Sequence, residues 1–313
     1  MQRFLAERRM KEQLPVARAA AAVRPRGPLT RAPQWAGGHA SPRQSIRGAL
    51  LLAALCAGGA SFQPAALWGE PVAVRFAEGV THGYLTLRTL DGKSLADGEL
   101  LQAVQGERVT SRLVFYFRDG SVQDETYVFS QHRSFRLLSD HLVQRGPAFP
   151  MPMEVGIDGT SGMVTVRYKE DGKEKLASER LDLPPDLANG LIFTLLKNIP
   201  RKTRQIAVSL VATAPKPRLV KVVIAPVGED PFTFGAATRQ AIHYLLKVEI
   251  GGLAGVIAPL LGKQPPDIHV WVQDGTAPTF VKSRGPIYAG GPIWEIRLAS
   301  PVWPRPPAAA KSR

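Results

Sequence analysis

The stretch Leu113-Val-Phe-Tyr-Phe-Arg-Asp-Gly120 decides the fold class of this chain. Leu113, Phe115 and Phe117 point to one side of an extended backbone, which is the period-two pattern of a strand with one buried face. The Asp119-Gly120 dipeptide that follows is a strong signal for a hairpin turn. The stretch therefore predicts a strand that turns directly back on itself.

The same pattern recurs along the chain on both sides of this stretch. It begins at Val72, Val74 and Phe76, and two further alternating runs end at Asp91-Gly92 and Asp171-Gly172. Three Asp-Gly turns between alternating runs predict an antiparallel meander. Later alternating runs predict more strands at 205–213, 218–227, 240–250, 268–273, 279–283 and 292–299.

Two apolar stretches are expected to be helical. Over 185–199, leucines and isoleucines recur at helical spacing, Pro184-Pro185 can open the helix, and Pro200 ends it. The stretch 251–262 is apolar on every side, which predicts burial. The predicted fold is mainly β: a large curved antiparallel sheet or half-barrel, over one domain at 70–303, with both short apolar helices packed on its concave side.

The N-terminal segment resembles an export signal. Arg43 and Arg47 precede an apolar run, and residues 49–60 combine that run with the small residues that a signal peptidase accepts, which predicts cleavage before Ser61. The run is too short to span a bilayer, so no transmembrane anchor is expected after processing. The alternative is a buried helix of a cytoplasmic protein. Lipid attachment at Cys56 is disfavoured because Leu55 precedes it, where a small residue is needed.

The net charge of +14 lies mainly at the two ends of the chain. Residues 1–48 carry +8 and are expected to be a basic disordered leader, a misassigned start or an organelle transit segment. The tail, 304–313, adds +3 and is proline-rich, which predicts disorder. About +3 is left for the folded part, so nucleic-acid binding is not expected.

The stretch His243-Tyr-Leu-Leu-Lys-Val-Glu-Ile-Gly-Gly-Leu-Ala-Gly-Val-Ile-Ala-Pro-Leu-Leu-Gly262, within this layout of strands, resembles an uncharacterised family of bacterial periplasmic β-meander proteins. More distantly, the layout resembles the half-barrel of the lipoprotein-localisation (Lol) carriers. The resemblance covers most of 70–300 and implies a concave apolar surface that holds an acyl chain or a lipidated partner. It also implies that the 251–262 stretch moves when ligand enters.

No catalytic, cofactor or metal motif is present in the sequence. Gly159-Thr-Ser-Gly162 lacks the spacing of a serine hydrolase, and His243 and His269 fall on different expected strands. Asp124 and Glu125 are adjacent on a strand, so their side chains point to opposite faces. We therefore expect no enzyme, although acid and base residues from distant strands remain an alternative.

The functional hypothesis is a periplasmic envelope protein that binds a lipid or a lipidated partner in an apolar concavity. A scaffold without ligand is the alternative from a different class, and an envelope hydrolase is a third. The candidate ligand-binding residues are the aromatic and aliphatic side chains that alternate along the expected strands and the 251–262 stretch: Phe115, Phe117, Tyr244, Leu246, Leu253, Ile257, Trp271 and Trp294.

Overall fold

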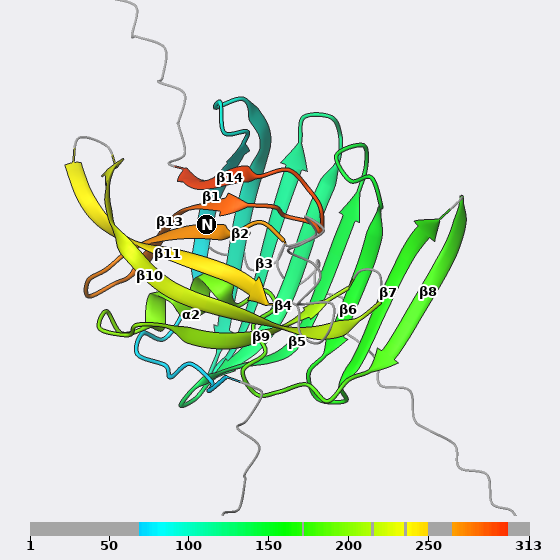
Figure 1. Ribbon diagram of the computed structural model, residues 1–313, viewed down its shortest axis with the longest axis horizontal. Coiled ribbons are helices and arrows are strands. Elements are labelled where there is room, and N and C mark those ends of the chain that lie inside the picture. The colour runs from blue at the N-terminus through cyan, green and yellow to red at the C-terminus, as the bar shows by residue number, and fades with distance from the viewer. Residues whose placement is uncertain (1–68, 171, 214–215, 235–236, 250–264, 300–313) are drawn as a thin grey trace, which may run out of the picture. The chain divides into compact units, whose positions relative to one another are not determined.

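Fourteen antiparallel strands form one continuous sheet (Figure 1). The structure is a computed structural model, and it describes residues 69–170, 172–213, 216–234, 237–249 and 265–299. The first eight strands are β1 (Thr81–Arg88), β2 (Ser94–Gln105), β3 (Arg108–Phe117), β4 (Val122–Gln131), β5 (Phe135–Arg145), β6 (Met153–Asp158), β7 (Met163–Glu170) and β8 (Lys173–Arg180). Helix α2 (Ile192–Asn198) precedes β9 (Ile206–Ala212), β10 (Arg218–Phe234), β11 (Ala237–Glu249), β12 (Ile268–Gln273), β13 (Thr279–Gly285) and β14 (Trp294–Ala299).

The sheet consists of two meanders, β1–β8 and β9–β14, which are joined where the first strand pairs with the last. The spatial order runs from β8 down to β1, then from β14 down to β9, so β1 pairs with β14 through Leu85↔Leu298 and Leu87↔Ile296. The sheet is not closed, and β8 and β9 are its edges. This arrangement confirms the predicted mainly β fold with a large antiparallel sheet.

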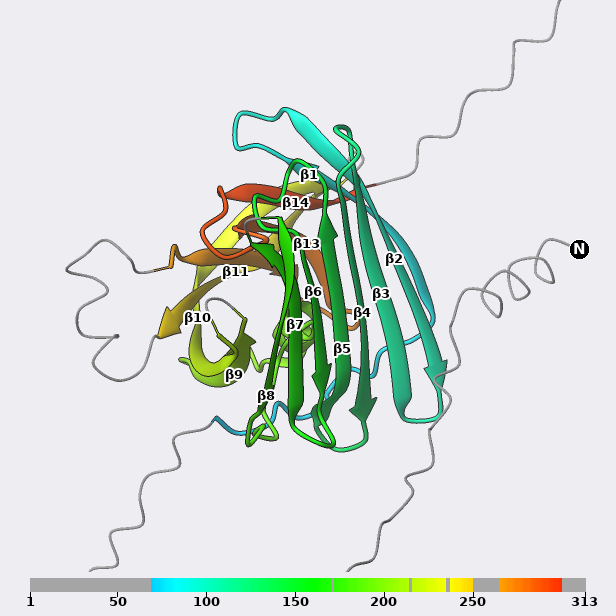
Figure 2. The same ribbon diagram turned by 90° about the vertical axis from the view of Figure 1, so that its right-hand side faces the viewer.

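The sheet curls, so that β9–β12 lie across from β3–β7 with α2 between them (Figure 2). A first apolar cluster joins the two halves. It contains Phe129 of β4, Val164 of β7, Leu196 of α2, Val222 of β10 and Tyr244 of β11, all almost completely buried. The alternation of apolar residues along each strand supplies this inner face, and burying it is the main term that stabilises the fold.

A second apolar cluster lies around β1, β2, β3 and β14. It includes Leu87, Phe115, Phe117 and Ile296. Gly98 of β2 belongs to the same packing, because a Cβ built there would lie 2.5 Å from Cε1 of Phe115. The glycine therefore leaves the space in which the Phe115 ring rests against β2.

Helix α2 confirms a helix before Pro200 but is shorter than the predicted span of 185–199. The reason is a competing backbone pairing. The N–H of Ala188 donates to the carbonyl of Ser209 at 2.8 Å, and Leu187 forms a parallel bridge with Ser209 of β9. These groups bond to the β9 edge and cannot complete a helical turn, so α2 begins at Ile192. The predicted helix at 251–262, the export segment and the C-terminal tail lie outside the described residues.

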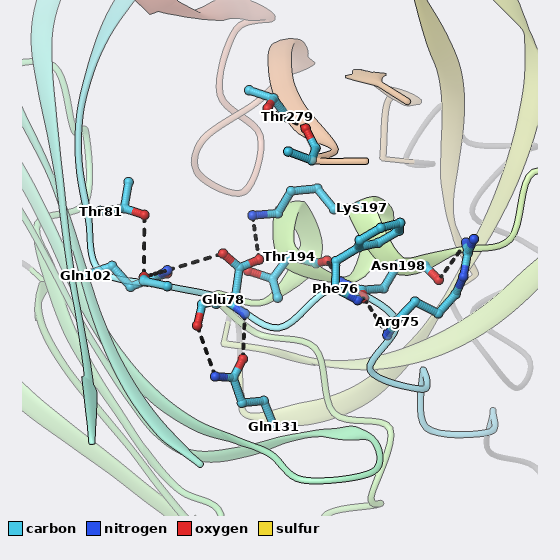
Figure 3. A network of polar contacts seen from close by, with 12 residues as sticks. Arg75, Phe76, Glu78, Thr81, Gln102, Gln131, Thr194, Lys197, Asn198 and Thr279 are labelled. Carbon is cyan, nitrogen blue, oxygen red and sulfur yellow. Dashed lines mark hydrogen bonds and ion pairs between the residues drawn. The ribbon is translucent and has the colours of Figure 1, made fainter. Parts of the chain in front are cut away.

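The alternating residues at 72–76 do not form the predicted strand. This segment, with residues 77–79, is an N-terminal strap that makes one isolated bridge, Ala73↔Ser134. Oδ1 of Asn198 accepts hydrogen bonds from the N–H groups of Arg75 and Phe76, at 2.9 and 2.7 Å (Figure 3). The amide of Gln131 bonds to both backbone groups of Glu78. Two backbone hydrogen bonds, from Val74 to Arg133 and from Phe135 to Val72, flank the bridge, and beyond it side-chain amides bond the strap in place of a ladder.

Candidate functional site

The described residues form an outer cleft of about 650 Å³. It lies between the projecting end of β10 and the strands β12, β13 and β14. Its lining combines an apolar wall, which includes Phe232, Phe280 and Leu298, with a cationic wall of Lys282 and Arg297. On β13 and β14 the two walls belong to opposite faces of the sheet. Leu298 is 37% exposed, which is high for a leucine on a strand. Apolar lining with a few polar groups is typical of a ligand site.

A bulge in the pairing of β12 with β13 positions the side chains of this cleft. Val272 pairs with Phe280 and Trp271 pairs with Lys282, so Val281 is the additional residue of β13. On one side of the bulge Phe280 packs against Phe193 of the helix, with ring centroids 4.5 Å apart. On the other side the ammonium of Lys282 lies 4.3 Å from the centroid of the Trp271 ring. Across the bulge, Phe280 therefore points toward the helix and Lys282 points to the other face of the sheet.

Charges along β13 and β14 are unevenly paired. Lys282 lies directly opposite Arg297, and Arg284 lies opposite Glu295. Nε of Arg284 donates to Glu295 at 2.7 Å, and Arg297 donates to the other oxygen of the same carboxylate. Burial alone would raise the pKa of Glu295, but these hydrogen bonds hold it below its ordinary value. Burial, and then the charge of Arg284, lowers the pKa of Lys282.

A chain of ring contacts and hydrogen bonds lies beside the cleft on β10, β11 and β12. Nε1 of Trp271 donates to Asp230 at 2.7 Å, and His243 stacks on the Trp271 ring at 4.3 Å between centroids. Nε2 of His243 lies 2.9 Å from Nδ1 of His269. Burial, and then His269, lowers the pKa of His243. Among the described residues no group of three or more His, Cys, Asp or Glu could hold a metal ion.

The sequence-predicted ligand residues are divided between three places. Phe115, Phe117 and Trp294 lie in the second apolar cluster, where the rings of Phe117 and Trp294 are 5.7 Å apart. Tyr244 and Leu246 lie in the first cluster, and each is at most 2% exposed. Trp271 lies on the face of β12 that points away from the first cluster, and its ring lies beneath Lys282. Leu253 and Ile257 lie outside the described residues. None of the described six lines the outer cleft.

Two carboxyl groups face the interior of the curled sheet. They belong to Glu125 of β4 and Asp140 of β5. The neighbouring Asp124 points to the opposite face, as predicted, and accepts a hydrogen bond from Arg112 at 2.9 Å. Burial raises the pKa of Glu125 to about 7. Burial, and then the charge of Glu125, raises the pKa of Asp140 well above its ordinary value. Oδ1 of Asp140 has no hydrogen-bond partner within the described part of the chain.

Sequence reasoning missed the cleft because its walls depend on strand register. Thr279–Ser283 and the run ending at Ala299 were predicted as strands, but only the pairing in space sets Lys282 opposite Arg297. The bulge at Val281 has no local signal in the sequence. The sequence places His243 and His269 on different strands. Their contact depends on the register of β11 and β12, which pairs His243 with Trp271, two residues from His269.

Fold and site together define a mainly β protein with one open antiparallel sheet, a short enclosed helix and an outer cleft with a cationic wall. No protein-family model matches the chain, and no curated protein matches it. The crystal structure of the hypothetical lipoprotein YmcC from Escherichia coli K12 is similar at 10% sequence identity and a TM-score of 0.32. The match covers 71% of this chain and 86% of that one. A likeness of this size carries no functional inference.

In the described residues no helix is long and apolar enough to cross a membrane.

Proposed function

We propose that this chain is an exported, periplasmic protein of the bacterial cell envelope that acts by binding rather than by catalysis. Its ligand is hydrophobic, a lipid or a lipidated partner. The observation that carries the proposal is the outer cleft, with its volume of about 650 Å³ and its exposed apolar wall. Cavities that hold small molecules have volumes of roughly 300–1,000 Å³.

The ligand is assigned to the outer cleft and not to the two packed apolar clusters. Interior side chains such as Phe115 and Phe129 have no exposed surface, so they are already in contact with other protein atoms. Leu298 and Phe232 retain accessible surface at the cleft. An acyl chain would cover that surface and gain about 25 cal/mol for each Å² of apolar area removed from water.

Export is supported by the sequence alone. Arg43 and Arg47 followed by the apolar 49–60 segment have the order of parts of a secretory signal. A single cysteine at position 56, inside the segment to be removed, suits a mature protein in an oxidising compartment.

A scaffold without ligand is the second candidate function, and the packed interior favours it. Within each of the two apolar clusters the side chains are buried by contact with one another, as expected of a purely structural component. The interior carboxyls Glu125 and Asp140 are the feature that an envelope hydrolase would use, but neither lines the outer cleft.

The test is native mass spectrometry of the full chain expressed with its own N-terminal segment and purified from the periplasmic fraction. We expect a chain that begins near Ser61 and carries an acyl-chain mass that solvent extraction removes. The Leu298→Asp variant should lose that mass. Leu176→Asp is the matched control, because Leu176 is 64% exposed on the distant edge strand β8 and should retain it.

Two results would overturn the proposal. A folded periplasmic chain that carries no lipid and does not rebind dodecanoic acid after extraction would favour the scaffold. A full-length chain found only in the cytoplasm would remove the argument for export.

A further inference from the structure

Glu125 of β4 and Asp140 of β5 are neighbours on the inner face of the curled sheet. Tyr127 pairs directly with Asp140, and Glu125 pairs with Leu142, so the two carboxyls are diagonal to each other across adjacent strands. Long side chains at diagonal positions lie within reach of one another. Burial, and then the charge of Glu125, raises the pKa of Asp140, which agrees with this proximity.

The carboxyl of Asp140 is buried without a complete set of hydrogen bonds. Asp140 is only 5% exposed, and its Oδ1 has no hydrogen-bond partner among the described residues. Its neighbours across the strands on this face are Tyr127 and Ile157. Leaving a buried polar atom unpaired costs about 1–3 kcal/mol, so folded proteins almost always provide a partner. A donor from a bound molecule would supply the missing hydrogen bond.

The inner face beside the two carboxyls is only partly covered. Glu125 keeps accessible surface, and so does Leu142, its cross-strand partner. Met153 of β6 and Tyr168 of β7, which continue this face, are also only partly buried at the margin of the first apolar cluster. A molecule bound to the carboxyls would therefore have apolar surface beside it.

The carboxyl pair lacks a counter-charge in the part of the chain that the structure describes. Burial raises the pKa of Glu125 to about 7, and no described cation lowers the pKa of Glu125 or of Asp140. Lys197 of the enclosed helix is already paired with Glu78, at 2.5 Å. A positively charged ligand would stabilise the ionised form of both carboxyls.

An ammonium group suits this pair better than a metal ion does. Ca²⁺ takes about six to eight oxygen ligands, more than two carboxyls contain. Within the described ranges no group of three or more His, Cys, Asp or Glu could hold a metal ion. A primary ammonium has three N–H donors and no acceptor, which matches ionised carboxylates that only accept.

We propose that the inner face of β4 and β5 binds the ammonium group of a small organic amine, which donates hydrogen bonds to the carboxylates of Glu125 and Asp140. The hydrocarbon part of the amine lies against Leu142. Neither carboxyl lines the outer cleft, so this is a second site and does not rest on the proposed function.

The test is isothermal titration calorimetry on the full chain with three probes. They are n-butylammonium, 1-butanol, which has the same hydrocarbon chain without the charge, and calcium chloride. We expect butylammonium to bind at least about tenfold more tightly than butanol, and calcium not to bind, because charge-assisted hydrogen bonds are the stronger ones. At pH 6.5 butylammonium should also release protons, because it favours the ionised carboxylates. Titrations in two buffers of different ionisation enthalpy measure that release.

Variants assign the binding to the two carboxyls. Glu125→Gln and Asp140→Asn should each weaken butylammonium binding about tenfold and reduce the proton release. Both amides keep the shape of the side chain, and either variant alone is sufficient if the other does not fold. Asp124→Asn is the matched control, because Asp124 is on the same strand but bonds to Arg112 on the opposite face, and it should bind butylammonium as the wild type does.

Each contrary outcome overturns the inference and leaves the outer-cleft function as it stands. Butanol bound as tightly as butylammonium would show that the site does not recognise charge. Butylammonium binding that persists in both carboxyl variants would place the amine elsewhere. Calcium bound more tightly than butylammonium, or no binding of any probe, would exclude an amine site.

Discussion

Nζ of Lys197 lies 2.5 Å from Oε1 of Glu78, which ties helix α2 to the N-terminal strap. The two side chains are only 20% and 10% exposed. The other carboxylate oxygen of Glu78 accepts a hydrogen bond from Gln102 at 3.2 Å. The pair is thus a largely buried salt bridge between segments more than a hundred residues apart, in the network drawn in Figure 3.

Lys197→Met should lower the free energy of unfolding by about 3 kcal/mol, because it leaves the Glu78 carboxylate buried without its counter-charge. Glu78→Gln should also destabilise the protein. The double variant should cost clearly less than the sum of the two single changes, since it leaves no unpaired buried charge. Chemical denaturation of all four proteins measures this coupling, and strictly additive costs would show that the pair does not hold the strap.

Gly98→Ala should destabilise the protein by roughly 1–3 kcal/mol, the usual cost of overfilling a packed core. The added Cβ would lie 2.5 Å from the Phe115 ring, which has no exposed surface into which it could move. Gly83→Ala on the neighbouring strand is the control, because the nearest atom to its Cβ, in Leu100, is 3.8 Å away. Thermal unfolding of both variants checks this, and an equal loss in both would assign the effect to backbone conformation.

These features differ in how far sequence could predict them. Leu113–Gly120 contains its own strand and turn, so local periodicity was sufficient for the sheet and its hairpins. The start of α2 depends on a competitor 21 residues away, Ser209, which accepts the N–H of Ala188. The outer cleft depends on one bulge and on cross-strand register. Local composition indicates neither of them. Hydrophobic periodicity therefore predicted the alternating aromatic residues as ligand-binding, and most of these are buried in the two clusters.

The interior carboxyls should make stability fall as the pH rises. The folded-state pKa of Glu125, about 7, lies above the ordinary value, and that of Asp140 is also raised. The folded protein therefore binds more protons than the unfolded chain between about pH 4 and pH 7, and stability decreases across that window. Because Glu125 keeps some accessible surface, we expect a loss of about 2 kcal/mol.

The Glu125→Gln/Asp140→Asn double variant should remove this pH dependence. Its free energy of unfolding, compared with that of the wild type, should rise steadily from pH 4 to pH 7, because only the wild type must ionise buried carboxyls. Denaturant titrations at several pH values provide the comparison. A constant difference between the two proteins would mean that the carboxyls ionise as readily in the folded chain as in the unfolded one.

The His243–His269 contact should make a contribution of opposite sign to the pH dependence, within the same pH range. Burial, and then His269, lowers the pKa of His243, and the cations of Lys282 and Arg284 add to this while Asp230 opposes it. The unfolded chain therefore takes up a proton first, and the contribution of His243 to stability falls as the pH drops below about 6.5. His243→Gln should flatten this part of the profile, because the amide does not titrate. An NMR titration of the His243 ring gives the direct measurement, and a His243 pKa above the ordinary histidine value would contradict the prediction.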